Sequence, residues 1–125
     1  MRMPRTTDAE RRARDQALQA EYRHAAEVPL ETARLSFKAL ELARVAALEG
    51  RADAASDAGA SALLARAAVH GAALNVLINL QTLDDETFVH ACRDEVDRLR
   101  ALARQVCDEV VGNVERRVED RKVTS

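Results

Sequence analysis

The polar side chains of this sequence that could do chemistry lie along one side of a single apolar stretch, residues 56–80. Wound as an α-helix at about 100° per residue, this stretch places seven small or polar residues in a sector about 80° wide, namely Asp57, Ser61, Ala65, Ala68, Ala72, Asn75 and Asn79. Asn75 and Asn79 lie one turn apart, which suits paired donor and acceptor contacts with one ligand. Asp57 falls in the first turn, where the helix dipole favours an ionised carboxylate. These residue types indicate hydrogen bonding and electrostatic stabilisation.

Each of these residues also has a purely structural explanation. Asp57 is equally suited to capping the N-terminus of the helix. The two asparagines could hydrogen-bond to a neighbouring helix inside the core, and Ser61 could be a small packing residue. A polar stripe on a buried helix must meet partners or line a cavity. We expect a cavity.

Large apolar residues cover almost all of the remaining surface of this predicted helix. They are Leu63, Leu64, Val69, Leu74, Val76, Leu77, Ile78 and Leu80. A surface helix normally has one apolar stripe and a charged back, whereas a helix that is apolar nearly all round is buried. The pattern therefore predicts a central buried helix at about residues 56–80, with Ser56 as its N-cap.

The residues on either side predict three further helices. Thr7 and Glu10 fit a capping box, so a first helix should run over about residues 8–27. Proline disfavours helical conformation in the residue before it, so Val28-Pro29 should end this helix and start a second one that reaches Gly50.

The last predicted helix begins after Asp84, which is expected as its N-cap. Its apolar residues recur at spacings of four and three, namely Phe88, Cys92, Val96, Leu99, Ala103, Val106 and Val110. No segment alternates as a strand would. The expected fold is all-α, a helical bundle formed by one domain over residues 1–125.

Composition argues against several functional classes. The 125 residues carry a formal net charge of −2 and no tryptophan, so no basic, aromatic-rich surface for nucleic acid is expected. The central stretch is long enough to cross a bilayer, but Asp57, Arg66, His70 and its two asparagines argue against a membrane span.

Cysteine and histidine spacing indicates neither a disulfide nor a metal site. Cys92 and Cys107 are fifteen residues apart on one predicted helix, or about 22 Å at 1.5 Å per residue, so they cannot pair. Reduced thiols are typical of a cytoplasmic protein. The three histidines show no metal-ligand spacing.

A helix that is apolar nearly all round needs neighbours on every side, and three companions are too few. We therefore expect either a homo-oligomer formed over this surface or further helices of the domain outside this chain. Gly59 and Gly71 are interpreted as positions where a crossing helix packs closely.

Four segments occur in a fixed order along the chain. They are Arg2-Met3-Pro4, EVPLETA at residues 27–33, SDAGA at residues 56–60 and GAALNVLINL at residues 71–80. In order and spacing they resemble the cyclodeaminase/cyclohydrolase family, which comprises the C-terminal domain of formimidoyltransferase-cyclodeaminase and the methenyltetrahydrofolate cyclohydrolases.

This resemblance implies an all-helical, dimer-forming domain of nearly twice this length. The family carries a Gly/Ser/Ala-rich helix and an Asp-containing helix upstream of the Arg2-Met3-Pro4 junction, so the chain is expected to be the C-terminal part of an incomplete domain. The implied activity is that of a formimidoyltetrahydrofolate cyclodeaminase or a methenyltetrahydrofolate cyclohydrolase. A tetrahydrofolate derivative would be the substrate, without a tightly bound cofactor.

The resemblance also implies roles for the polar residues. Both reactions pass through a tetrahedral carbon between nitrogens, which calls for a carboxylate near the cationic substrate and hydrogen bonds to the pterin. Asp57 would supply electrostatic stabilisation or positioning, whereas Ser61, Asn75, Asn79 and Glu27 would bind substrate. Capping of the helix that starts at Pro29 is the structural alternative for Glu27. The competing function is a non-catalytic helical oligomerisation or interaction module, in which the stripe is a seam against another subunit.

Overall fold

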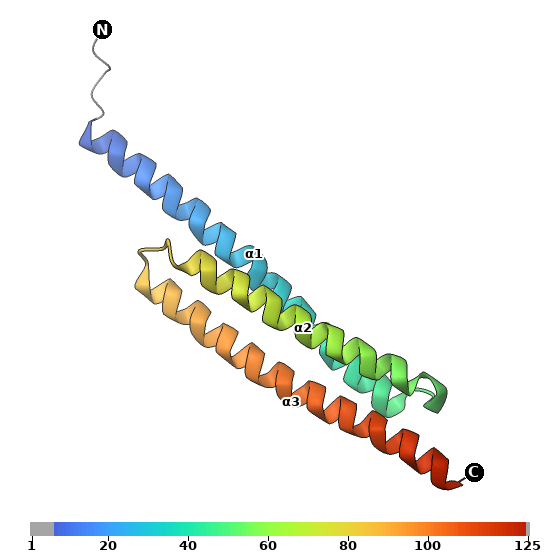
Figure 1. The fold of residues 1–125 in the computed structure, drawn as a ribbon. Coiled ribbons are helices and arrows are strands. Elements are labelled where there is room, and N and C mark those ends of the chain that lie inside the picture. Colours follow the sequence, from blue (N-terminus) through green and yellow to red (C-terminus); the bar gives the residue numbers. More distant parts are fainter. Residues whose placement is uncertain (1–6, 125) are drawn as a thin grey trace.

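Three long α-helices form the bundle in the computed structural model, which describes residues 7–124, with side chains as far as residue 120 (Figure 1). They are α1 (Asp8–Glu49), α2 (Ala55–Leu80) and α3 (Glu86–Thr124), and a short 3₁₀ helix, η1 (Ala52–Ala54), joins α1 to α2. No strand occurs in the described part, so the predicted all-α bundle is confirmed. The match at Arg2-Met3-Pro4 lies outside the described residues.

α1 is one continuous helix, so the predicted break at Val28-Pro29 and the prediction of four long helices are wrong. Pro29 lies inside the helix, where proline costs about 3 kcal/mol or more. Ala26 and Leu30 flank it and are buried in the core. Packing on both sides of Pro29 therefore outweighs its local preference.

Of the N-caps predicted for the first and the central helix, one is correct and one is wrong. The Thr7 hydroxyl accepts a hydrogen bond from the Glu10 backbone N–H at 3.1 Å, which confirms the predicted N-cap. Ser56 is not an N-cap, because η1 leads directly into α2 and the cap position falls on Ala54, which has no side-chain acceptor.

The start of α3 is one residue later than predicted. The Asp85 carboxylate caps the helix by accepting from the Phe88 backbone N–H at 3.1 Å. Asp84 is occupied differently, because its backbone N–H donates to the Gln19 side chain of α1 at 2.9 Å. The loop is thus fastened to α1 directly before the Asp85 cap.

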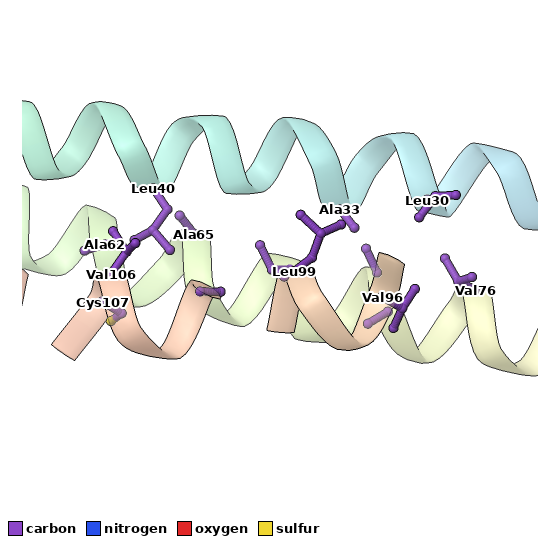
Figure 2. Packing of buried hydrophobic residues seen from close by; sticks show 14 of the residues in the cluster. Leu30, Ala33, Leu40, Ala62, Ala65, Val76, Val96, Leu99, Val106 and Cys107 are labelled. Carbon is purple, nitrogen blue, oxygen red and sulfur yellow. The ribbon is translucent and has the colours of Figure 1, made fainter. Parts of the chain in front are cut away.

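The core runs along the length of the bundle and is built mainly from alanine, valine and leucine (Figure 2). In Figure 2, Leu40 of α1 extends toward the side of α2 that carries Ala62 and Ala65. The predicted apolar seam of α3 is confirmed, since its members from Cys92 to Val110 are buried and Phe88 packs at the edge of the core.

α2 buries its small residues and exposes large ones. The side facing α1 and α3 contributes mostly Ala, Gly and Val to the core, whereas Leu64, Leu74 and Ile78 are 72%, 63% and 58% exposed. The expectation of burial all round α2 therefore fails for this outward side. α1 and α3 leave this outward side of α2 uncovered.

Candidate functional site

The polar stripe of α2 borders a groove between α1 and α2 that contains two hollows. The first, here called the asparagine hollow, has a volume of about 530 Å³. Its walls are Val28, Pro29 and Thr32 of α1 and Ala68, Ala72, Asn75 and Asn79 of α2. Pro29, predicted to end a helix, instead forms part of the wall opposite the asparagines.

The second hollow, here called the aspartate hollow, lies toward the other end of the same groove. It measures about 430 Å³, and Asp57 and Ser61 line it together with Ala39, Leu42, Ala43, Ala46, Gly50, Ala54 and Ala58. Six of the seven predicted stripe residues thus line one or other hollow. The expectation that the stripe borders cavities agrees with this placement, whereas the roles of its residues stay predictions.

The structure separates Asp57 from the asparagines. Asn75 follows Asp57 by eighteen positions of continuous α2, which corresponds to about 27 Å along the helix axis. Within one chain, these two side chains cannot contact the same reacting carbon. Asn75 and Asn79, by contrast, lie one turn apart in the same hollow.

Glu27 lies apart from both hollows of the groove. It lines a third hollow, of about 390 Å³, between α1 and α3. The Glu27 carboxylate accepts a hydrogen bond from Arg23 Nε at 3.2 Å, one turn earlier on α1. Glu27 thus lies apart from the other predicted substrate-binding residues, and its role stays a prediction.

The two asparagines have different hydrogen-bonding states. Asn79 Nδ2 donates to the backbone oxygen of Ala25 on α1 at 3.1 Å. The exposed Asn75 side chain has no hydrogen-bond partner among the described residues. Thr32, on the opposite wall, donates its hydroxyl to the Val28 backbone oxygen at 3.2 Å. Among the described residues, Asn75 is thus the carboxamide of this hollow that no other protein group engages.

The ionisable groups with shifted pKa values lie outside the groove. Between α1 and α3, the hydrogen bond from Arg34 lowers the pKa of Glu95, and burial raises the pKa of the Cys92 thiol. Between α2 and α3, burial lowers the pKa of His70. The groove itself therefore offers hydrogen bonds and shape, and its carboxylate is the exposed Asp57.

Sequence reasoning missed the cross-helix pair Arg34–Glu95 and the fastening role of Gln19. Gln19 also donates from Nε2 to the Thr82 backbone oxygen at 3.2 Å, in addition to its contact with Asp84. Both interactions join residues more than sixty positions apart. Helical periodicity predicts which face a residue occupies, but it carries no signal for the partner across the interface.

The described residues lack a cluster of metal ligands but include one helix that could cross a membrane by its length. They contain no group of three or more His, Cys, Asp or Glu placed to hold a metal ion. Residues 52–80 form one segment long and apolar enough to cross a membrane by length and composition, a test that core helices also pass.

Comparison with known proteins places the chain in a family. A family model described as formiminotransferase-cyclodeaminase matches residues 1–98. A methenyltetrahydrofolate cyclohydrolase of Methylorubrum extorquens is 34% identical over 116 residues, which cover 93% of this chain and 56% of that protein. A formimidoyltransferase-cyclodeaminase of Rattus norvegicus is 32% identical over 119 residues, covering 95% of this chain and 22% of that protein.

A second formimidoyltransferase-cyclodeaminase, from Gallus gallus, is 33% identical over 94% of this chain and 22% of its own length. The chain therefore spans about half of the matched cyclohydrolase and a smaller share of the other two. The matched residues include the whole of α1 and α2, which form the groove. The chain belongs to the formiminotransferase-cyclodeaminase family, a family of folate cyclodeaminases and cyclohydrolases.

Proposed function

We propose that this chain binds a tetrahydrofolate derivative carrying a one-carbon unit and takes part in a cyclohydrolase or cyclodeaminase reaction. The observation that carries the proposal is the asparagine hollow, in which a free carboxamide faces small and apolar wall residues. Its volume falls within the range of about 300–1,000 Å³ that is usual for small-molecule sites. Family membership supports the same ligand class.

The chemistry of the hollow fits recognition of a pterin. A pterin ring presents neighbouring donors and acceptors at its edge and flat apolar faces. Asn75 offers one donor group and one acceptor, whereas Pro29, Ala68 and Ala72 offer a wall without polar side chains. This arrangement orients the ring, which holds the one-carbon unit in a fixed place.

The acid–base step needs a group other than Asn75. In the hydrolase reaction water adds to the methenyl carbon, and a proton must reach the nitrogen that leaves it. Asp57 lies too far along α2 to serve a carbon held beside Asn75 in the same chain. Asp57 therefore has no part in the step at this carbon within one chain, and we place proton transfer on groups outside this groove.

The test follows the absorbance of methenyltetrahydrofolate in the presence of the chain and measures binding by equilibrium dialysis. Asn75→Leu should weaken binding at least tenfold, because a polar ligand edge would lose its partner. Gln105→Leu is the matched control, since Gln105 is an exposed amide on α3 outside the groove. A chain that neither binds nor converts the folate contradicts the proposal.

The second candidate function is a helical interaction module, and the outward side of α2 favours it. Contiguous exposed apolar side chains such as Leu64, Leu74 and Ile78 are typical of an interface. We propose that copies of the chain associate over this side in the cytoplasm. Sedimentation of Leu64→Ser with Ile78→Ser should show loss of assembly, whereas Asn75→Leu should keep assembly and lose folate.

A further inference from the structure

Pro29 leaves a gap in the hydrogen-bond ladder of α1. In an α-helix, the N–H of residue 29 would donate to the carbonyl oxygen of residue 25. Proline has no N–H, and Pro29 lies inside the continuous α1 helix. The Ala25 carbonyl therefore has no donor at the position where its helical partner should be.

Asn79 supplies a donor at this gap from the neighbouring helix. Its Nδ2 atom donates to the Ala25 oxygen at 3.1 Å, across 54 positions of sequence. Ala25 is exposed and Asn79 is half-buried, so this bond lies at the edge of the α1–α2 interface. The side-chain amide thus takes the place of the missing backbone N–H.

Asn79 also lies in the last turn of α2, where further hydrogen bonds join the helix end to the loop that follows. The backbone oxygen of Asn79 accepts from the Thr82 hydroxyl at 3.3 Å, and Gln19 of α1 holds Thr82 and Asp84 just beyond. Asn79 and Gln19 therefore fasten the last turn of α2 and the following loop to α1. This attachment lies beside the asparagine hollow, whose opposite walls carry Pro29 and Asn75.

We propose that Asn79 is a positioning residue, which completes the hydrogen bonding of α1 at Pro29 and holds the hollow open for ligand contact by Asn75. The coupling between Asn79 and Pro29 stands on geometry alone, whereas the ligand contact of Asn75 rests on the proposed folate function. The two asparagines, which look equivalent in sequence, thereby have different roles.

A double-mutant cycle tests the coupling without any ligand. Asn79→Ala should raise the unfolding equilibrium constant about two- to tenfold, the effect of one hydrogen bond, measured by urea denaturation. In a Pro29→Ala background, the restored N–H of residue 29 serves the Ala25 oxygen, so the same change should have a much smaller effect. Asn75→Ala is the matched control and should have equal effects in both backgrounds. Equal effects of Asn79→Ala in both backgrounds would overturn the proposal.

Ligand-binding measurements on the same variants distinguish a positioning role of Asn79 from direct contact with the ligand. Methenyltetrahydrofolate is the probe, and its affinity is measured by equilibrium dialysis. Asn79→Ala should weaken binding, and adding Pro29→Ala should recover part of the loss. Pro29→Ala should recover nothing in Asn75→Ala. Recovery in neither background would assign Asn79 to ligand contact and refute the positioning role.

Absence of binding by the unaltered chain would refute the folate function and the contact assigned to Asn75. The denaturation cycle would then be the test of the positioning role.

Discussion

Arg34 of α1 and Glu95 of α3 form a two-pronged ion pair that joins the two helices. Arg34 Nε lies 2.5 Å from Glu95 Oε2, and Arg34 Nη2 lies 2.7 Å from Oε1. Glu31, one turn before Arg34, adds a contact of 3.3 Å. The pair raises the pKa of Arg34 and lowers that of Glu95. It borders the α1–α3 hollow, on another side of α1 from the asparagines.

Glu95→Gln should lower the free energy of unfolding at pH 7 by about 1 kcal/mol, the upper end for a partly exposed pair of good geometry. Glu95 has a lower pKa in the folded chain than its ordinary 4.5. Its contribution is therefore fully present above that ordinary value and is lost as the pH falls through the folded value. Urea denaturation at pH 7 and pH 4 measures the difference from the unaltered chain, which should shrink at pH 4.

Asp94→Asn is the control for this pair, because Asp94 is the preceding exposed carboxylate on α3. It should change stability little at either pH. A difference for Glu95→Gln that equals that of Asp94→Asn, or that stays constant with pH, would contradict the assigned pairing.

The local features of this fold were predictable because they depend on spacing along one helix. The Thr7 cap and the buried seam of α3 follow from sequence positions alone. The break at Pro29 was predicted wrongly, since α1 continues through that point, where Asn79 of α2 donates to the Ala25 oxygen. The spacing of residues near Pro29 cannot predict a hydrogen-bond partner that lies 54 positions away in the sequence.

The candidate site was predictable in part for the same reason. The α2 stripe follows from helical periodicity, and most of it does line a groove. The opposite wall, formed by Val28, Pro29 and Thr32, depends on how α1 packs. The placement of Glu27 beside α3 depends on it as well. Helical periodicity alone could predict neither the α1 wall of the asparagine hollow nor the position of Glu27.

Arg117→Gln should destabilise the end of α1 by about 1–2 kcal/mol. Its guanidinium, on α3, donates from Nη1 to the Ala47 oxygen at 2.6 Å and from Nη2 to the Gly50 oxygen at 3.1 Å. The last turn of α1 has no basic residue of its own, so this cation from α3 satisfies its terminal carbonyls and its dipole.

Hydrogen exchange measures the effect of Arg117→Gln directly. Amides in the last turn of α1 should exchange faster, whereas those around Leu30 should change little. Arg116→Gln is the matched control, because Arg116 contacts Asn113 on its own helix. Equal exchange in the two variants would show that Arg117 does not hold the end of α1.

His70 should make the chain less stable as the pH falls below 6.5. Its Nε2 atom is shielded from solvent and has no hydrogen-bond partner among the described residues. Burial lowers its pKa, and so do Arg104 and Arg100 of α3 and Arg66 of α2. The unfolded chain then takes up the proton first, so stability declines from the ordinary value of 6.5 and levels off below the folded pKa.

Thermal unfolding of His70→Leu at pH 7.5 and pH 5.5 tests this dependence. The variant should lose less stability than the unaltered chain between the two pH values, because it has no group to protonate there. His24→Leu is the control, since His24 is exposed on α1. An identical decline in the unaltered chain and in His70→Leu would refute the role given to His70.

Gly71→Ala should have opposite effects on folding and on assembly. A Cβ at Gly71 meets no atom within 4 Å in this chain, so the predicted close packing there does not come from α1 or α3. Alanine is favoured over glycine in a helix interior by about 1 kcal/mol, and unfolding of a dilute sample should show this gain. Gly71 lies seven residues from both Leu64 and Ile78 on the exposed side of α2. If copies associate there, a methyl group hinders the close approach of a second helix.

Sedimentation should therefore show weaker self-association for Gly71→Ala despite its greater stability. Gly59→Ala is the comparison, because a Cβ at Gly59 meets Val114 of α3 at 3.5 Å and faces the core. That variant should leave association unchanged, since its added methyl group contacts only the same chain. Unchanged association in Gly71→Ala would place the interface between copies away from the Leu64–Ile78 side of α2.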